Sequence, residues 1–153
     1  VITAGNASQI TDGAAAVLVC NDAGLKKIKC DPLVKVKGIS VVGDDPILML
    51  TGPIPATKKV LSESKLNIDE IGLYEVNEAF APVPLAWEIE VKADRSKLNV
   101  NGGAMALGHP LGASGAKLMT TLIYEMHRRN EKYGLQAICE GGGTANATIL
   151  EKI

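Results

Sequence analysis

Residues 112–153 read GASGAKLMTTLIYEMHRRNEKYGLQAICEGGGTANATILEKI, a helical pattern followed by two strand patterns. Over 112–134 apolar side chains recur at helical spacing, in a stripe of Ala116, Met119, Ile123 and Met126 with Leu122 beside it. A histidine and two arginines (127–129) end this segment, where the helix dipole favours cations. The runs 135–139 and 144–153 have strand character, and the short glycine turn between them predicts an antiparallel pair.

Upstream of this stretch, predicted strands alternate with predicted helices. The small polar residues 1–13 indicate a loop. Strands are predicted at 14–20, 33–43 and 71–76, and helices at 21–29, 56–65 and 78–91. Alternation of the two element types predicts an α/β fold.

Composition excludes several classes of partner. The 153 residues carry a net charge of −1, so no basic surface for nucleic acid is expected. No apolar run approaches the roughly 18 residues that a membrane-spanning helix needs. We therefore expect neither nucleic acid nor a membrane as a partner. The chain opens with VITAGNAS, without a methionine, and we expect it to be a piece of a longer protein.

Three widely spaced cysteines, Cys20, Cys30 and Cys139, match neither a disulfide framework nor a zinc site. No metal is expected, and the cysteines favour a reducing, cytoplasmic location. We expect Cys20 and Cys30 to be structural.

The glycine-rich stretch NVNGGAMALGHPLGASGAK (99–117) surrounds one of only two histidines, His109. Its glycines match neither a P-loop nor a dinucleotide-binding fingerprint. They are better explained as conformational freedom around His109, just before the long helix.

Two further polar spots lie at predicted strand ends, where sites gather in α/β folds. Asn77 and Glu78 follow the strand at 71–76, and Cys139 enters the glycine turn. A cysteine, a histidine and an asparagine that meet there would suit thiol chemistry. The residues alone leave simpler roles open: Cys139 as a small core residue, His109 as a hydrogen-bonded loop residue and Asn77 as a helix cap.

Four motifs in this order resemble the thiolases: TAGNASQITDGAAAVL (3–18), NEAFA (77–81), the stretch 99–117, and CEGGGTANATI (139–149). The resemblance implies interconversion of 3-oxoacyl-CoA plus CoA with acetyl-CoA plus a shortened acyl-CoA, through an acyl-cysteine. It implies two similar βαβαβαββ halves stacked in five layers, and a homodimer or homotetramer. Residues 31–153 would be the C-terminal domain, with a mixed five-stranded sheet and helices on both faces, and 1–30 the tail of the N-terminal or loop region. No cofactor is implied, because coenzyme A is a substrate.

The same resemblance assigns catalytic roles. His109 would take the proton from the nucleophilic cysteine and help to hold the thioester oxygen. Asn77 would hold a water in that first oxyanion hole. Cys139 would be the acid/base that deprotonates CoA in thiolysis or the acetyl methyl group in condensation. Gly141 would offer its backbone N–H to the second oxyanion hole.

The resemblance also assigns contacts with the substrate. Ser8, with Ala4 and Gly5, matches a stretch that touches the pantetheine of CoA. Ala79 and Phe80 would line the same tunnel.

The chain departs from the family pattern at several positions. The nucleophilic cysteine of thiolases lies in their N-terminal half, and Cys20 and Cys30 stand in no matching motif, so we expect the isolated chain to be inactive. Glu140 replaces a small or aliphatic residue. Two alternatives remain: a condensing enzyme like the ketoacyl synthases, or a non-catalytic CoA-binding or assembly module.

Overall fold

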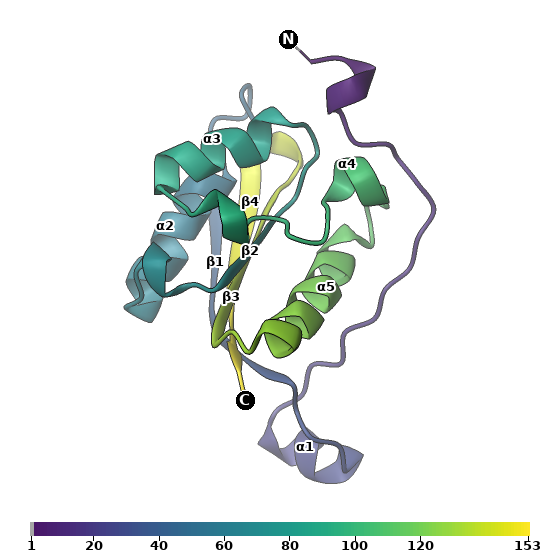
Figure 1. Cartoon of the computed structure of the whole chain (residues 1–153), viewed down its shortest axis with the longest axis vertical. Helices are drawn as coiled ribbons and strands as arrows, with labels where there is room; N and C mark the ends of the chain where they lie inside the picture. The colour runs from purple at the N-terminus through teal and green to yellow at the C-terminus, as the bar shows by residue number, and fades with distance from the viewer. Residues whose placement is uncertain (1) are drawn as a thin grey trace.

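The computed structural model describes residues 2–153 and is built around one mixed sheet (Figure 1). The strands are β1 (Val34–Gly43), β2 (Leu73–Val76), β3 (Tyr133–Cys139) and β4 (Thr144–Lys152), in the order β1-β4-β3-β2. β3 and β4 pair antiparallel, as the glycine turn predicts, and β1 pairs antiparallel with β4. β2 runs parallel to β3. The two strands that end in candidate site residues are therefore neighbours.

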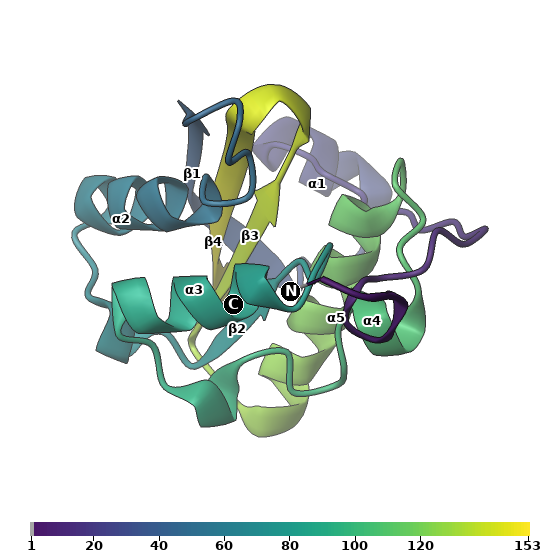
Figure 2. The same ribbon diagram turned by 90° about the horizontal axis from the view of Figure 1, so that it is seen from above.

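Helices cover both faces of the sheet, as Figure 1 and Figure 2 show. On one face lie α2 (Pro53–Ser64) and α3 (Pro82–Val91), and on the other lies α5 (Ser114–Arg129). Prolines occupy the first turns of α2 and α3, where the missing N–H costs no hydrogen bond. The predicted α/β class with helices on both faces is confirmed.

The core beneath α2 and α3 is centred on two aromatic rings. Trp87 and Tyr74 are 0% and 1% exposed and meet edge to face, with ring centroids 5.3 Å apart. Each polar tip has a partner: Trp87 Nε1 donates to Thr57 Oγ1 at 2.8 Å, and the Tyr74 hydroxyl donates to the Ile68 carbonyl at 3.0 Å. This packing holds β2 in place, and with it Asn77, the candidate residue that follows β2.

The buried stripe of α5 differs in part from the predicted one. Leu118, Leu122, Ile123 and Met126 are buried, whereas Met119 is half-buried and Ala116 contributes little to the core. Leu118 lies one turn before Leu122, so the stripe follows the period of an α-helix that packs against β2 and β3.

The sheet has four strands, not the expected five. Between α3 and α5 only one bridge, Tyr74 to Leu98, extends the sheet beyond β2. The next residue, Asn99, has a φ of 46°, which turns the chain away from the sheet edge. The run 14–20 is also wrong as a strand, because it is extended without a strand partner among residues 2–153 and most of its residues are exposed.

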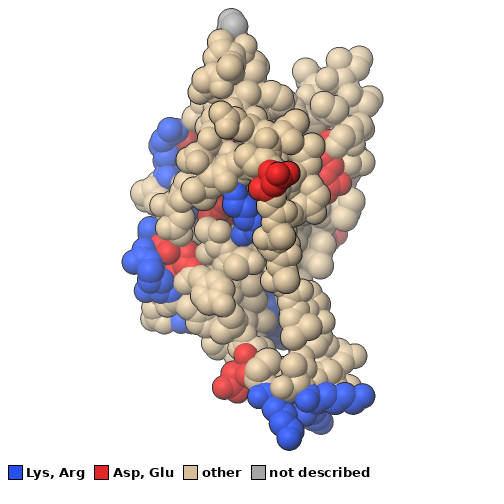
Figure 3. All heavy atoms as spheres, turned by 90° about the vertical axis from the view of Figure 1, so that its right-hand side faces the viewer, with Lys and Arg blue, Asp and Glu red and all other residues tan. Residues whose placement is uncertain are grey.

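Residues 2–21 form a strap on the α5 side of the molecule, and α1 (Asp22–Ile28) follows at the end remote from the site (Figure 1). Lysines of α1 gather at this tip (Figure 3). Cys20 and Cys30 flank α1 and are both exposed, so neither packs into the core formed by residues 2–153.

Short elements connect the larger ones. They are η1 (Ala4–Asn6), η2 (Ile68–Glu70), η3 (Arg95–Lys97), α4 (Ala104–Leu107) and η4 (Gly141–Gly143). Within residues 2–153, none of the helices has the length and apolar character that crossing a lipid bilayer requires.

Candidate active site

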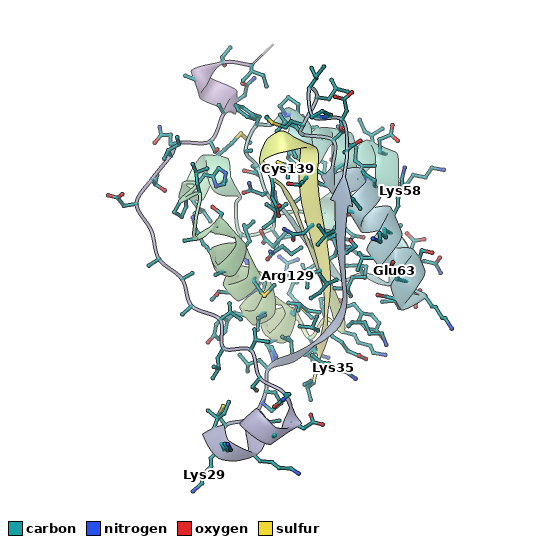
Figure 4. All side chains as sticks on the ribbon, turned by 180° about the vertical axis from the view of Figure 1, so that it is seen from behind. Lys29, Lys35, Lys58, Glu63, Arg129 and Cys139 are labelled. Carbon is teal, nitrogen blue, oxygen red and sulfur yellow. The ribbon has the colours of Figure 1, made fainter. Side chains whose placement is uncertain are left out.

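Three chain segments meet at one end of the sheet. β2 leads into Asn77, whose N–H donates to the Ala137 carbonyl of β3 at 3.0 Å. β3 ends two residues later at Cys139, which Figure 4 places at the end of the molecule opposite Lys29. The loop that carries His109 joins α4 to α5 at the same end. The parallel pairing of β2 with β3 therefore brings Asn77 and Cys139 to one end of the sheet, and the α4–α5 loop adds His109.

Polar groups contact both ring nitrogens of His109. Ser114 Oγ donates to the Pro110 carbonyl at 3.0 Å, which uses its only proton. We assign the imidazole proton to Nδ1, so that the same oxygen, 2.6 Å away, accepts it. In this tautomer Nε2 has the lone pair, and the Asn77 amide donates to it from Nδ2 at 3.4 Å. His109 is thus set up to accept a proton at Nε2.

The charge state of His109 supports the same role. Burial, followed by the positive charge of Lys117, lowers the pKa of His109 below its ordinary value of 6.5. Lys117 is itself fixed, because its Nζ donates to the carbonyls of Leu107 and Gly108 at 2.7 and 2.9 Å. The imidazole is therefore neutral at pH 7.

The loop before His109 requires glycine at position 108. Gly108 has a φ of 84°, and a Cβ there would lie 2.5 Å from Thr11 Oγ1. This close approach lets the strap pair with the loop, where the His109 N–H donates to the Gln9 carbonyl at 2.9 Å. At this position the prediction of backbone freedom around His109 is confirmed.

Cys139 and His109 line one pocket of about 370 Å³. Its wall also includes Ala79, Gly141 and the apolar side chains of Met49, Leu50, Leu111 and Ile138. Burial, with a smaller contribution from Glu140, raises the pKa of the Cys139 thiol. Cys139 is therefore a thiol at neutral pH and can donate a proton into the pocket.

Glu140, the departure from the family pattern, is tied to the next strand. Its two carboxylate oxygens accept hydrogen bonds from Thr144 and Asn146. Its N–H also donates to the Thr144 carbonyl at 2.8 Å. Glu140 thus closes the turn that presents Gly141 to the pocket.

The strap brings part of the predicted CoA-binding stretch to the site. Ser8 donates to the Ala79 carbonyl through both its N–H and its hydroxyl, at 3.1 and 3.0 Å. Ala7 pairs with Phe80 as an isolated bridge. Ala4 and Gly5 lie in the exposed η1, outside the residues that line the pocket.

Further residues, for which the sequence predicts no such role, hold the site in place. Ser114 is hydrogen-bonded to His109 Nδ1, and Lys117 holds the loop in front of it. Asn99 and Glu78 form a further hydrogen-bonded pair beside Asn77. Their spacing along the sequence carries no signal, except that Ser114 stands one turn beyond Pro110 at the start of α5.

A buried glutamate lies two residues before Asn77. Glu75 is 2% exposed, and its Oε2 has no hydrogen-bond partner among residues 2–153. It faces Gln136 across the β2–β3 pair, and the Oε1 atom of Gln136 is equally unpartnered. Burial, then the charges of Glu78 and Glu125, raises the pKa of Glu75 to about 8. Glu75 is therefore protonated at neutral pH.

This protonation predicts how stability changes with pH. Between pH 4.5 and about 8 the unfolded chain ionises Glu75 while the folded chain keeps it protonated, so stability falls as pH rises. Glu75→Gln removes this loss. From pH 5 to pH 8 we expect wild type to lose about 2–4 kcal/mol of unfolding free energy through Glu75. Glu75→Gln should not show this loss, so the difference in unfolding free energy between the two proteins should grow by that amount. Urea denaturation of both proteins at both pH values checks this, and an equal difference at the two values would contradict it.

Comparison with known proteins identifies the family. A family model described as "Thiolase, C-terminal domain" matches residues 30–152. The chain belongs to the thiolase family. It is 55% identical over 152 residues to the steroid 3-ketoacyl-CoA thiolase FadA6 of Mycobacterium tuberculosis, covering 99% of this chain and 37% of that protein. It is 46% identical over 151 residues to the acetyl-CoA acetyltransferase of Cupriavidus necator, covering 99% of this chain and 38% of that protein.

Solved thiolases share the fold. The acetyl-CoA acetyltransferase of Bacillus anthracis superposes with a TM-score of 0.95 at 41% identity, covering 99% of this chain and 39% of that one. Human mitochondrial 3-ketoacyl-CoA thiolase in complex with CoA gives a TM-score of 0.90 at 42% identity, with the same two coverages. The chain thus spans less than two fifths of the length of these thiolases.

Proposed function

We propose that this chain is the C-terminal part of a longer thiolase, here called the parent enzyme, and that it supplies the proton-transfer groups of its active site. The parent enzyme would cleave 3-oxoacyl-CoA with CoA, or run the reverse Claisen condensation. The observation that carries the proposal is that a neutral His109, with Asn77 beside its Nε2, shares a pocket with the protonated thiol of Cys139.

His109 would act first. Its Nε2 lone pair accepts the proton of the nucleophilic cysteine, a residue that we expect outside residues 1–153. The thiolate then attacks the 3-oxo carbonyl carbon. The imidazolium Nε2–H, with a water held by Asn77, donates to the thioester oxygen of the acyl-enzyme.

Cys139 would act at the broken bond. Cleavage of the carbon–carbon bond leaves the electron pair on the enolate of acetyl-CoA, and the Cys139 thiol donates its proton to that carbon. The Gly141 N–H would stabilise the enolate oxygen. In thiolysis the resulting Cys139 thiolate takes the proton of the incoming CoA thiol. The CoA sulfur then attacks the acyl-enzyme, and the released nucleophilic thiolate takes its proton back from the His109 imidazolium, which restores both cysteines.

Substrate contacts follow from the strap and the pocket wall. Ser8, with Ala4 and Gly5, would contact the pantetheine, and Ala79 and Phe80 would line its tunnel. The bonds from Ser8 to the Ala79 carbonyl support this arrangement. The parent enzyme would need no further cofactor and would form a homodimer or homotetramer. Three unpaired cysteines fit the cytoplasm.

A thiolysis assay of the purified parent enzyme tests the proposal. CoA-dependent consumption of a 3-oxoacyl-CoA is the expected result. A folded parent enzyme that binds CoA without cleaving such substrates would favour a non-catalytic CoA-binding module instead.

The isolated chain is expected to show no thiolysis and to self-associate. Cys139 and His109 can move protons, but Cys20 and Cys30 lie beside α1, at the end remote from the pocket (Figure 4). Apolar side chains also remain exposed, including Ile39 and Val41 on β1 and Leu18 and Val19 on the strap. An assay of purified 1–153 with light scattering on the same sample checks both points. Turnover would contradict the first and a stable monomer the second.

A further inference from the structure

Asn99 occupies the place where a fifth strand would pair with β2. β2 is an edge strand, so the backbone groups of Val76 on its outer side lack a strand partner. The Asn99 side chain satisfies both: Oδ1 accepts from the Val76 N–H at 2.8 Å, and Nδ2 donates to the Val76 carbonyl at 2.9 Å. The Asn99 side-chain amide thus makes the two hydrogen bonds to the Val76 backbone that a neighbouring strand would otherwise make.

Glu78, the residue after Asn77, continues this connection. The second Nδ2 proton of Asn99 goes to Glu78 Oε1 at 2.9 Å. Glu78 Oε2 accepts the Met105 N–H at 3.1 Å, in the first turn of α4. Gly103 lets the carboxylate approach, because a Cβ there would overlap the carboxylate of Glu78. Glu78 therefore caps the helix that leads to Gly108 and His109.

Asn99 and Glu78 hold the chain on both sides of Asn77, and Glu78 also holds α4, the helix that precedes His109. The Asn99 side chain is hydrogen-bonded to Val76 and to Glu78, the two residues that flank Asn77. His109 follows α4, whose first turn is bound to the same Glu78 carboxylate. The connection runs from the β2 edge through Asn99 and Glu78 to α4.

We propose that Asn99 and Glu78 are positioning residues that set the contact between Asn77 Nδ2 and His109 Nε2 in the thiolase site. The inference rests on the proposed function. Neither residue lines the pocket with Cys139, so neither is expected to touch the reacting atoms. Their effect would be on the geometry of the first oxyanion hole, where a misplacement of about 1 Å costs on the order of 10²-fold in rate.

The test uses Asn99→Gly in the parent enzyme. Glycine tolerates the positive φ of 46° at this position, so the substitution removes the amide without adding backbone strain. We expect kcat to fall by about 10²-fold, while KM for CoA stays within about twofold. The matched control is Asn130→Gly, because Asn130 has a φ of 61° but caps the other end of α5. It should leave kcat unchanged.

Glu78 is tested by two variants. Glu78→Ala should lower kcat as Asn99→Gly does, whereas Glu78→Gln keeps one acceptor oxygen and should recover part of the loss. Folded Asn99→Gly and Glu78→Ala enzymes with wild-type kcat would overturn the proposal, as would equal losses in the Asn130→Gly control.

A readout that needs no turnover separates this proposal from the proposed function. In both Asn99→Gly and Glu78→Ala, amide exchange at Met105 should accelerate, and the ¹⁵N chemical shifts of the His109 ring should change. If the wild-type parent enzyme lacks thiolysis but these signals move, the proposed function fails and the positioning geometry stands. Unchanged signals in both variants would overturn the positioning role whatever the activity.

Discussion

Cys139→Ser in the parent enzyme is expected to lower turnover by about three orders of magnitude. A serine hydroxyl fits the same space but is a much weaker acid than a thiol, so it neither protonates the enolate nor forms the base that activates CoA. Loss of a positioned acid/base typically costs 10²–10⁴-fold in rate. Steady-state thiolysis measures the loss, and rapid-quench mass spectrometry follows acylation of the nucleophile, which should remain possible.

The exposed Cys20 and Cys30 provide the controls for this experiment. Cys20→Ser and Cys30→Ser remove a thiol by the same chemistry, far from the pocket, and should leave turnover unchanged. Normal turnover in Cys139→Ser would exclude Cys139 as the acid/base.

His109→Ala is expected to act earlier, by slowing formation of the acyl-enzyme about 10²–10³-fold. The substitution removes the Nε2 proton acceptor and a donor to the oxyanion, and one such donor contributes roughly 3–4 kcal/mol. The lowered pKa of His109 adds a signature: in the wild type, acylation should fall as pH drops below 6.5, because protonation abolishes the base. In His109→Ala this acid limb should disappear.

The matched control is His127→Ala. His127 lies in the last turn of α5 and contacts the Leu33 carbonyl, far along the helix from the pocket. This variant should acylate at the wild-type rate. Acylation at that rate in His109→Ala would remove His109 from the first proton transfer.

The sequence predicted most of the fold because most elements carry local signals. The glycine turn at 141–143 is enough to predict the antiparallel pairing of β3 with β4, and the apolar period of 114–129 predicts α5. Two expected strands, the fifth strand of the sheet and the run 14–20, do not form among residues 2–153 because each lacks continuous pairing with a neighbour. Leu98 pairs only once before Asn99 turns the chain, and a positive φ at an asparagine leaves little trace in a sequence. The run 14–20 has the composition of a strand but no strand partner within residues 2–153.

The residues of the site also fall into two groups, those that local sequence signals predict and those that they do not. Asn77, His109 and Cys139 each stand at a strand end or beside glycines, and the parallel pairing of β2 with β3 brings the ends together. Ser114, Asn99 and Glu78 act through hydrogen bonds to partners that the folded chain supplies, some more than twenty residues away. Such contacts depend on tertiary structure, so no local pattern predicts them.

The most direct test of the central claim is a chimaera in which this chain replaces the matching 37% of the FadA6 thiolase. If residues 1–153 supply the proton-transfer groups of a thiolase, the folded chimaera should cleave a 3-oxoacyl-CoA that FadA6 itself cleaves. Introducing Cys139→Ser into the chimaera should then abolish that cleavage. A folded chimaera that binds CoA but shows no thiolysis, or one whose activity survives Cys139→Ser, would contradict the claim.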